Sequence, residues 1–178
     1  MTIVFSPLRS TGLTFVGAGL LVLIRGVIEL WDPIYWHPET TLDYAAALLT
    51  TLAWLVTGLA FVLWFRSTHH QFLSWILLVA GAAIAVSGFG NLLEDVFDIG
   101  FGEVLFTGGG VVGVTAVLVA AVVTLTISGP VRWSSVFLFA FIAGSIFPDD
   151  GGQFVMGFAL IGLGFLLMRS NRTLDAST

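Results

Sequence analysis

The chain has 178 residues, of which 57% are hydrophobic and 10% are charged, and its formal net charge is −5. A soluble domain carries about 25% charged residues, so this composition excludes a soluble protein and indicates an integral membrane protein. The sequence contains no cysteine and no lysine, which excludes disulfides, thiolate chemistry and a Schiff-base chromophore.

Six apolar segments follow one another along the chain, separated by short stretches rich in Pro, Gly and polar residues. About 20 apolar residues in a helix cross a hydrocarbon core of about 30 Å. We therefore predict an all-α fold, a bundle of six membrane-spanning helices that makes residues 1–178 a single membrane domain. The predicted spans are about 11–30, 42–65, 72–97, 104–127, 131–147 and 153–168. Thr40 and Asp43 match a capping box at the start of the second span.

The charges predict how these spans are oriented. Alternating six spans places the two termini on one side of the membrane, together with five of the six arginines, Arg9, Arg66, Arg132, Arg169 and Arg172. Ten of the eleven acidic residues then lie on the other side. Because arginine in short loops stays in the cytoplasm, we expect a multi-pass protein of the cell membrane with both termini cytoplasmic.

The turn between the third and fourth spans, residues 90–103, holds an unusual concentration of acidic side chains. The spacing i, i+3, i+4, i+7 puts four polar residues on one predicted helix face, Asn91, Glu94, Asp95 and Asp98. One interpretation is a solvated acidic loop, and another is a surface for a partner protein. A third is a cation or proton site in an outward-facing vestibule, for which the candidate cation-binding residues are Asp95, Asp98 and Glu103.

Arg25 lies inside the first predicted span, about 24 Å from Arg9 at 1.5 Å per residue. A charged side chain there costs at least ~2.5 kcal/mol, so it needs a partner or a route to water. One interpretation is that it snorkels to the headgroups and pairs with Glu29, four residues later. The alternative is a polar intramembrane cluster with Glu29, Asn91 and Glu94, which would form the centre of a translocation path or a lipid-headgroup or anion site.

Small residues at a spacing of four positions mark the third and fourth spans. Gly109 and Gly113 form a GxxxG pattern. On the third span, Gly81 and Ala85, with Gly88 and Gly90 beyond them, are candidates for the groove that faces this pattern. Small residues at this spacing allow close helix packing in lipid. We predict helix-packing roles for Gly81, Ala85, Gly109 and Gly113, either inside the bundle or against a partner.

No nucleophile in the sequence has a plausible base at the same level of the membrane, so we expect no catalytic residues. His37 is predicted on the other side of the membrane from His69 and His70, so we expect no haem, no other cofactor and no metal. The partners that we expect are membrane lipids and either a second copy or another membrane protein, with no nucleic acid.

Three classes of function are open, and the third of them, an intramembrane enzyme, has the least support because no nucleophile is paired with a base. The first is a small transporter or channel-like protein with an outward-facing acidic vestibule. The second is a non-catalytic membrane subunit or scaffold that binds a partner helix, a lipid or a pigment. A polar cavity that reaches Arg25 would favour the first, and a dry interior with an exposed glycine groove would favour the second.

Overall fold

The computed structural model describes residues 7–31, 38, 40–147 and 151–175, and these residues form helices and short connections without any strand. The helices are α1 (Pro7–Trp31), α2 (Thr41–Ser67), α3 (Gln71–Asn91), η1 (Leu92–Val96), α4 (Phe101–Thr126), η2 (Pro130–Trp133), α5 (Ser134–Ile146) and α6 (Gln153–Asp175). Each of the six predicted spans therefore corresponds to one helix. The expectation of an all-helical fold is confirmed for this part of the chain.

Five of the helices are long and apolar enough to cross a membrane, which suits a membrane-embedded protein. The exception is α5, which with η2 forms an apolar helical segment from Val131 to Ile146. At 1.5 Å per residue these 16 residues reach about 24 Å, less than a hydrocarbon core of about 30 Å.

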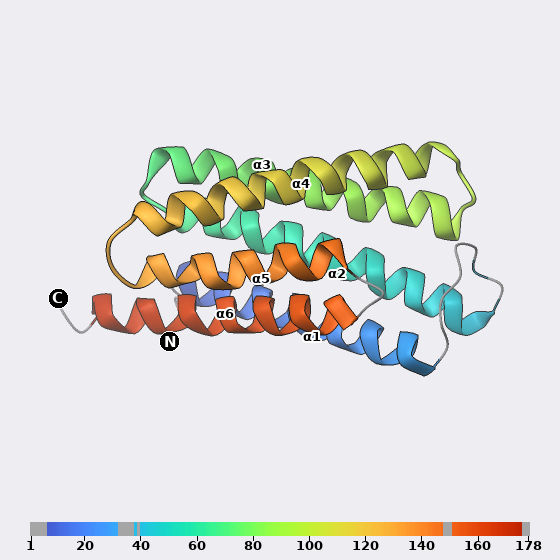
Figure 1. Ribbon diagram of the computed structural model, residues 1–178, viewed down its shortest axis with the longest axis horizontal. Coiled ribbons are helices and arrows are strands. Elements are labelled where there is room, and N and C mark those ends of the chain that lie inside the picture. Colours follow the sequence, from blue (N-terminus) through green and yellow to red (C-terminus); the bar gives the residue numbers. More distant parts are fainter. Residues whose placement is uncertain (1–6, 32–37, 39, 148–150, 176–178) are drawn as a thin grey trace, which may run out of the picture.

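The six helices form a closed ring in which each packs against the next along the chain and α6 packs against α1. Successive helices run in opposite directions, so both termini lie at the same end of the bundle (Figure 1). We call this the terminal end, and it also holds the turns at 68–70 and 127–129. The opposite end, which holds the turn at 97–100, is called the acidic end. Four arginines lie near the terminal end, Arg9, Arg66, Arg132 and Arg169.

The start of α2 has the capping box that the sequence predicts. The Thr40 side chain accepts a hydrogen bond from the Asp43 backbone N–H at 3.2 Å, and the Thr40 N–H donates to Asp43 Oδ2 at 2.8 Å. These two bonds satisfy backbone and side-chain groups that the first helical turn would otherwise leave unpaired. The cap fixes where α2 begins at the acidic end.

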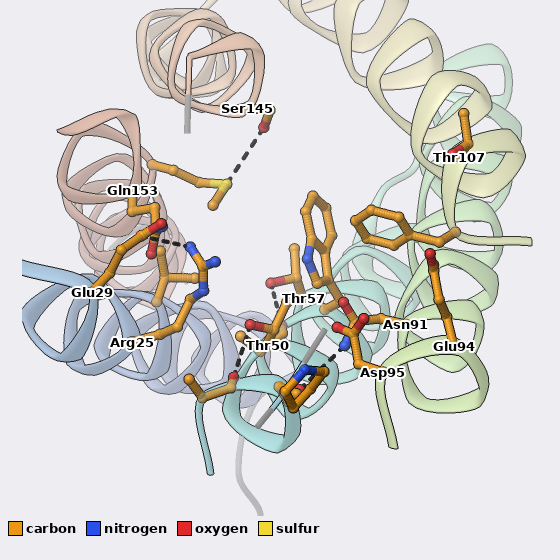
Figure 2. Close-up of a pocket in the computed structure, with 18 of the residues that line it drawn as sticks. Arg25, Glu29, Thr50, Thr57, Asn91, Glu94, Asp95, Thr107, Ser145 and Gln153 are labelled. Carbon is orange, nitrogen blue, oxygen red and sulfur yellow. Dashed lines mark hydrogen bonds and ion pairs between the residues drawn. The ribbon is translucent and has the colours of Figure 1, made fainter. Parts of the chain in front are cut away.

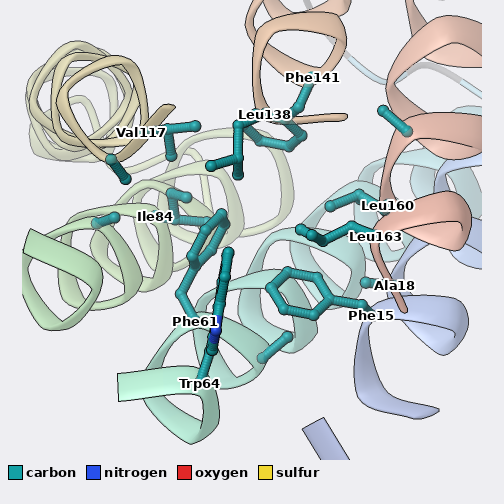
Figure 3. Close-up of a cluster of buried hydrophobic side chains, with 14 of the residues drawn as sticks. Phe15, Ala18, Phe61, Trp64, Ile84, Val117, Leu138, Phe141, Leu160 and Leu163 are labelled. Carbon is teal, nitrogen blue, oxygen red and sulfur yellow. The ribbon is translucent and has the colours of Figure 1, made fainter. Parts of the chain in front are cut away.

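Aromatic side chains fill the interior of the ring toward the terminal end (Figure 3). Phe15 meets Phe61 edge to face with ring centroids 5.1 Å apart, and Trp64 stacks beside Phe61 at 6.3 Å. All three are at most 2% exposed. This half of the bundle is therefore closed by close packing.

Glycines set the spacing between neighbouring helices. A methyl group on Gly109 would come within 2.7 Å of the Ala83 carbonyl oxygen, and one on Gly113 would lie 2.8 Å from the Ile84 side chain, so α4 packs closely on α3. Gly81 instead faces α2, where a methyl group would lie 2.7 Å from the Gly58 carbonyl oxygen, and Ala85 also faces Gly58. The expectation that Gly81 and Ala85 supply the groove for Gly109 and Gly113 is therefore wrong, because their side of α3 is turned toward α2.

Candidate functional site

A cavity of about 830 Å³ lies inside the acidic end of the ring (Figure 2). Every long helix and η1 contribute to its wall. Along α2 its lining runs from Ala46 to Thr57, a rise of about 16 Å at 1.5 Å per residue. Trp54 and Phe141 line its deeper part, and their rings meet edge to face at 6.3 Å. Phe141 also meets Phe61 at 6.4 Å, so the cavity ends where the aromatic packing begins.

One wall of the cavity carries Arg25, Glu29 and Gln153. Arg25 Nη1 lies 2.9 Å from Glu29 Oε2, and the two side chains are 21% and 20% exposed. Glu29 Oε2 also accepts a hydrogen bond from Gln153 Nε2 at the start of α6. The predicted local pair is present, and all three side chains line the cavity (Figure 2).

The close approach of α6 to α1 makes this wall possible. Gly12, Gly19 and Gly26 recur every seven residues on α1 and face α6. A methyl group on Gly12 would come within 2.5 Å of the Gly164 carbonyl oxygen, and one on Gly19 within 2.5 Å of the Gly157 carbonyl oxygen. A methyl group on Gly26 would lie 3.4 Å from Gln153 Cβ. Two helices in such contact can hold Glu29 and Gln153 together although they are 124 positions apart.

Asn91 lies on the opposite wall and is 5% exposed. Its Nδ2 donates to the Ala47 carbonyl oxygen at 3.2 Å and to Thr51 Oγ1 at 3.1 Å. Both partners belong to α2, so Asn91 links α3 to α2. It lines the same cavity as Arg25 and Glu29 but lies across it from them (Figure 2).

Glu94 and Asp95 extend the wall that Asn91 begins, because α3 continues into a single π-helical turn, η1. The π-helix is rare and occurs mostly as single turns, frequently at functional sites. The first turn of α4 packs directly on this turn, since a methyl group on Gly102 would come within 2.5 Å of the Glu94 backbone nitrogen. Glu103, the next residue, also lines the cavity. Three carboxylates are thus gathered from η1 and α4.

Asp98 does not join these carboxylates. The helical turn ends at Val96, and Asp98 adopts a φ of 54° in the following turn. Its side chain is exposed and is not part of the cavity lining. The expectation that Asp98 shares a face with Asn91, Glu94 and Asp95 is therefore wrong, because that face requires one more turn of helix.

The structure brings together residues that the sequence did not single out. Gln153, Trp54, Phe141 and Thr50 line the cavity without having been predicted. In the sequence Gln153 follows a stretch of Pro, Asp and Gly, a composition typical of connections between helices, where a polar residue is ordinary. The three α1 glycines at a spacing of seven are a signal in the sequence that could have indicated the α1–α6 contact.

Among the residues that the structure describes, the charged residues of the lining are one arginine and four carboxylates, Arg25, Glu29, Glu94, Asp95 and Glu103. An excess of carboxylates in a recess with low-dielectric walls produces a negative potential that attracts cations. Within the described part of the chain, no group of three His, Asp or Glu side chains is arranged to hold a metal ion. The cavity therefore combines a negative electrostatic potential from its carboxylates with an apolar lining in its deeper part.

No family model matches the chain, and neither the comparison with curated proteins nor that with solved structures finds a match. The function is therefore argued from the geometry of the cavity.

Proposed function

We propose that this chain is a small transporter or channel-like protein of the cell membrane and that the cavity is its entrance from outside. The observation that carries the proposal is a cavity of about 830 Å³ that reaches the Arg25 and Glu29 pair. Ligand sites in proteins are recesses of about 300–1,000 Å³ with a few polar groups in an apolar lining. An intramembrane charged residue that faces such a cavity marks a substrate or ion pathway by default.

In this proposal the acidic end faces outward and both termini are cytoplasmic. The support is the charge distribution, since Arg9, Arg66, Arg132 and Arg169 lie near the terminal end and positive residues stay in the cytoplasm. The short α5 then makes the sixth crossing. Helix α5 ends at Ile146, and the preceding residue, Ser145, lines the cavity. Water that enters the cavity would reach this end of α5, so the helix needs to cross a shorter apolar distance.

The closed half of the bundle favours a transporter over an open channel. Phe15, Phe61 and Trp64 pack in contact below the cavity floor. A solute in the cavity can leave on the terminal side only if these rings move apart. In this proposal the structure is the outward-open state of an alternating-access cycle, and the cavity is the opening to the outside. The cycle requires one part of the bundle to move against another.

A scaffold function has less support. That interpretation needs an exposed glycine groove, whereas Gly81, Gly109 and Gly113 are buried against neighbouring helices. The glycines of α1 at 12 and 19 are likewise covered by α6.

The test is reconstitution into vesicles with a flux screen of ions and of small cationic, anionic and neutral solutes. Thr50→Phe should fill the cavity and abolish the flux, because Thr50 lines it. Thr115→Phe is the matched control, since both threonines donate to the carbonyl oxygen four residues earlier, at 2.9 and 2.7 Å, but Thr115 is exposed on α4. If the solute flux into vesicles with the wild-type protein does not exceed the flux into empty vesicles, the proposal of transport is rejected. If the two variants show equal flux, the cavity is rejected as the route.

A further inference from the structure

We propose that the ligand of the cavity is an organic ammonium ion, a protonated amine with an apolar body. The inference rests on the proposed function and adds the class of substrate to it. Three observations carry it: the charge of the lining, the aromatic floor and a buried amide oxygen of Gln153.

The charge of the lining selects a cation. Its arginine lies 2.9 Å from Glu29, so this pair presents no net charge to the cavity. Glu94 and Asp95 on η1 and Glu103 on α4 line the other side. An anion would have to approach these three carboxylates, whereas a cation would be drawn toward them.

The size and the floor of the cavity select an organic ion over an inorganic one. A volume of about 830 Å³ is far larger than a single metal ion or its first water shell requires. Trp54 and Phe141 line the deep part, and Val22, Phe106 and Met156 add further apolar surface to the lining. Aromatic faces attract ammonium groups and pack against apolar bodies. An inorganic cation has no apolar body to pack against this floor, so it gains less from it than an organic ammonium ion does.

Gln153 selects a cation that carries N–H groups. The residue is 2% exposed, and its Nε2 donates to Glu29. Its Oε1 is buried and accepts no hydrogen bond from any residue that the structure describes. A buried acceptor without a donor is unfavourable, so a ligand that donates here is bound more tightly than one that cannot. A primary ammonium group supplies such a donor, and a quaternary one does not.

The experiment uses the full chain in lipid nanodiscs and measures binding by titration calorimetry. The probes share a phenylethyl body: phenethylammonium, its trimethylammonium analogue, 2-phenylethanol and 3-phenylpropanoate. We expect phenethylammonium to bind best, the neutral and anionic probes to bind at least about tenfold more weakly, and the trimethyl analogue to lie between them. An anion or an alcohol that binds as tightly as phenethylammonium would overturn the proposal.

Paired variants tie the binding to the cavity. Glu94→Gln should weaken phenethylammonium binding by about tenfold, since it removes one carboxylate of the lining. Asp98→Asn removes the same charge four residues away but outside the cavity, and it should leave the affinity unchanged. If Glu94→Gln does not fold, Glu103→Gln takes its place, because that side chain is exposed at the rim. Equal effects of the inside and outside variants would overturn the assignment.

The same probes separate this inference from the proposed function. Currents from reconstituted vesicles on a solid support report whether phenethylammonium moves across the membrane. Movement of phenylpropanoate in place of the ammonium ion would overturn the substrate class and leave transport standing. Specific binding of phenethylammonium without any solute movement would overturn transport and leave the ligand class standing.

Discussion

At the scale of the residue, Glu29 holds two partners from different helices, the charged Arg25 of α1 and the neutral amide of Gln153 at the start of α6. Glu29 lies one turn after Arg25 on α1, and its Oε2 accepts hydrogen bonds from both Arg25 Nη1 and Gln153 Nε2. The pair is about one-fifth exposed and faces the cavity. It is therefore desolvated enough for the loss of one member to be felt, and less costly than a fully buried pair.

Replacing Arg25 with Gln should lower the free energy of unfolding by about 1–3 kcal/mol, because Glu29 would keep its charge without the guanidinium. The measurement is the melting temperature of the purified protein in one detergent. The double variant Arg25→Gln, Glu29→Gln should recover part of the loss, since it removes both charges. A melting temperature equal to that of the wild type in Arg25→Gln would show that the pair does not stabilise the fold.

The polar residues of the cavity were predicted only in part from their spacing in the sequence. The spacing of Asn91, Glu94 and Asp95 predicted one face, and these three do line one wall. The pattern did not reveal that η1 is a π-helical turn or that the helix ends before Asp98. The first turn of α4 packs directly on this segment, a contact that the pattern of a single helix does not encode.

At the scale of the element, the contact between α1 and α6 holds the cavity wall together. Gly12 and Gly19 leave no room for a side chain against the backbone of α6. By contrast, a methyl group on Gly17 of the same helix would meet nothing within 4 Å. The two kinds of glycine therefore allow a controlled test of this contact.

Gly19→Ala should destabilise the protein by about 2 kcal/mol or more, because the new methyl group would overlap the Gly157 carbonyl oxygen and force the helices apart. Gly17→Ala should be neutral or stabilise by up to about 1 kcal/mol through helix propensity alone. Both are measured as melting temperatures under identical conditions. Equal shifts for the two variants would contradict the close contact between α1 and α6.

At the scale of the whole molecule, a ring of six antiparallel helices separates two ends of different character. The terminal end is closed by aromatic packing and carries arginines, and the acidic end contains the cavity. Figure 1 also shows that α5 and the beginning of α6 stop short of the acidic ends of α2, α3 and α4. The wall of the acidic end is therefore lower on the side formed by α5 than on the side formed by α2, α3 and α4.

The proposed orientation is tested by single cysteines, for which the cysteine-free chain is a ready background. Gly100→Cys at the acidic end, where a side chain meets nothing within 4 Å, should react with a membrane-impermeant maleimide on intact cells. His69→Cys at the terminal end is exposed and should react only after permeabilisation. The reverse pattern would overturn the orientation.

Phe147→Cys tests the sixth crossing in the same assay. Phe147 follows α5 directly and is 60% exposed. If α5 crosses the membrane, this cysteine should react from outside, as Gly100→Cys does. Labelling from the cytoplasmic side alone would show that α5 does not cross.

The sequence by itself determined the all-helical fold and the position of each helix, with ends that agree to within seven residues. It offered the pairing of Arg25 with Glu29 as one of two interpretations, and the structure contains that pair. These features depend on hydropathy, turn residues and spacings of three or four positions, all of which act within one segment. Only the tertiary structure decided that α6 closes the ring on α1, that Gln153 reaches Glu29, and that Trp54 and Phe141 form the floor of a cavity. The physical reason is that these contacts join helices far apart in the chain. Their register is set by glycine contacts and aromatic packing between surfaces, and neither is visible in the pattern of any single helix.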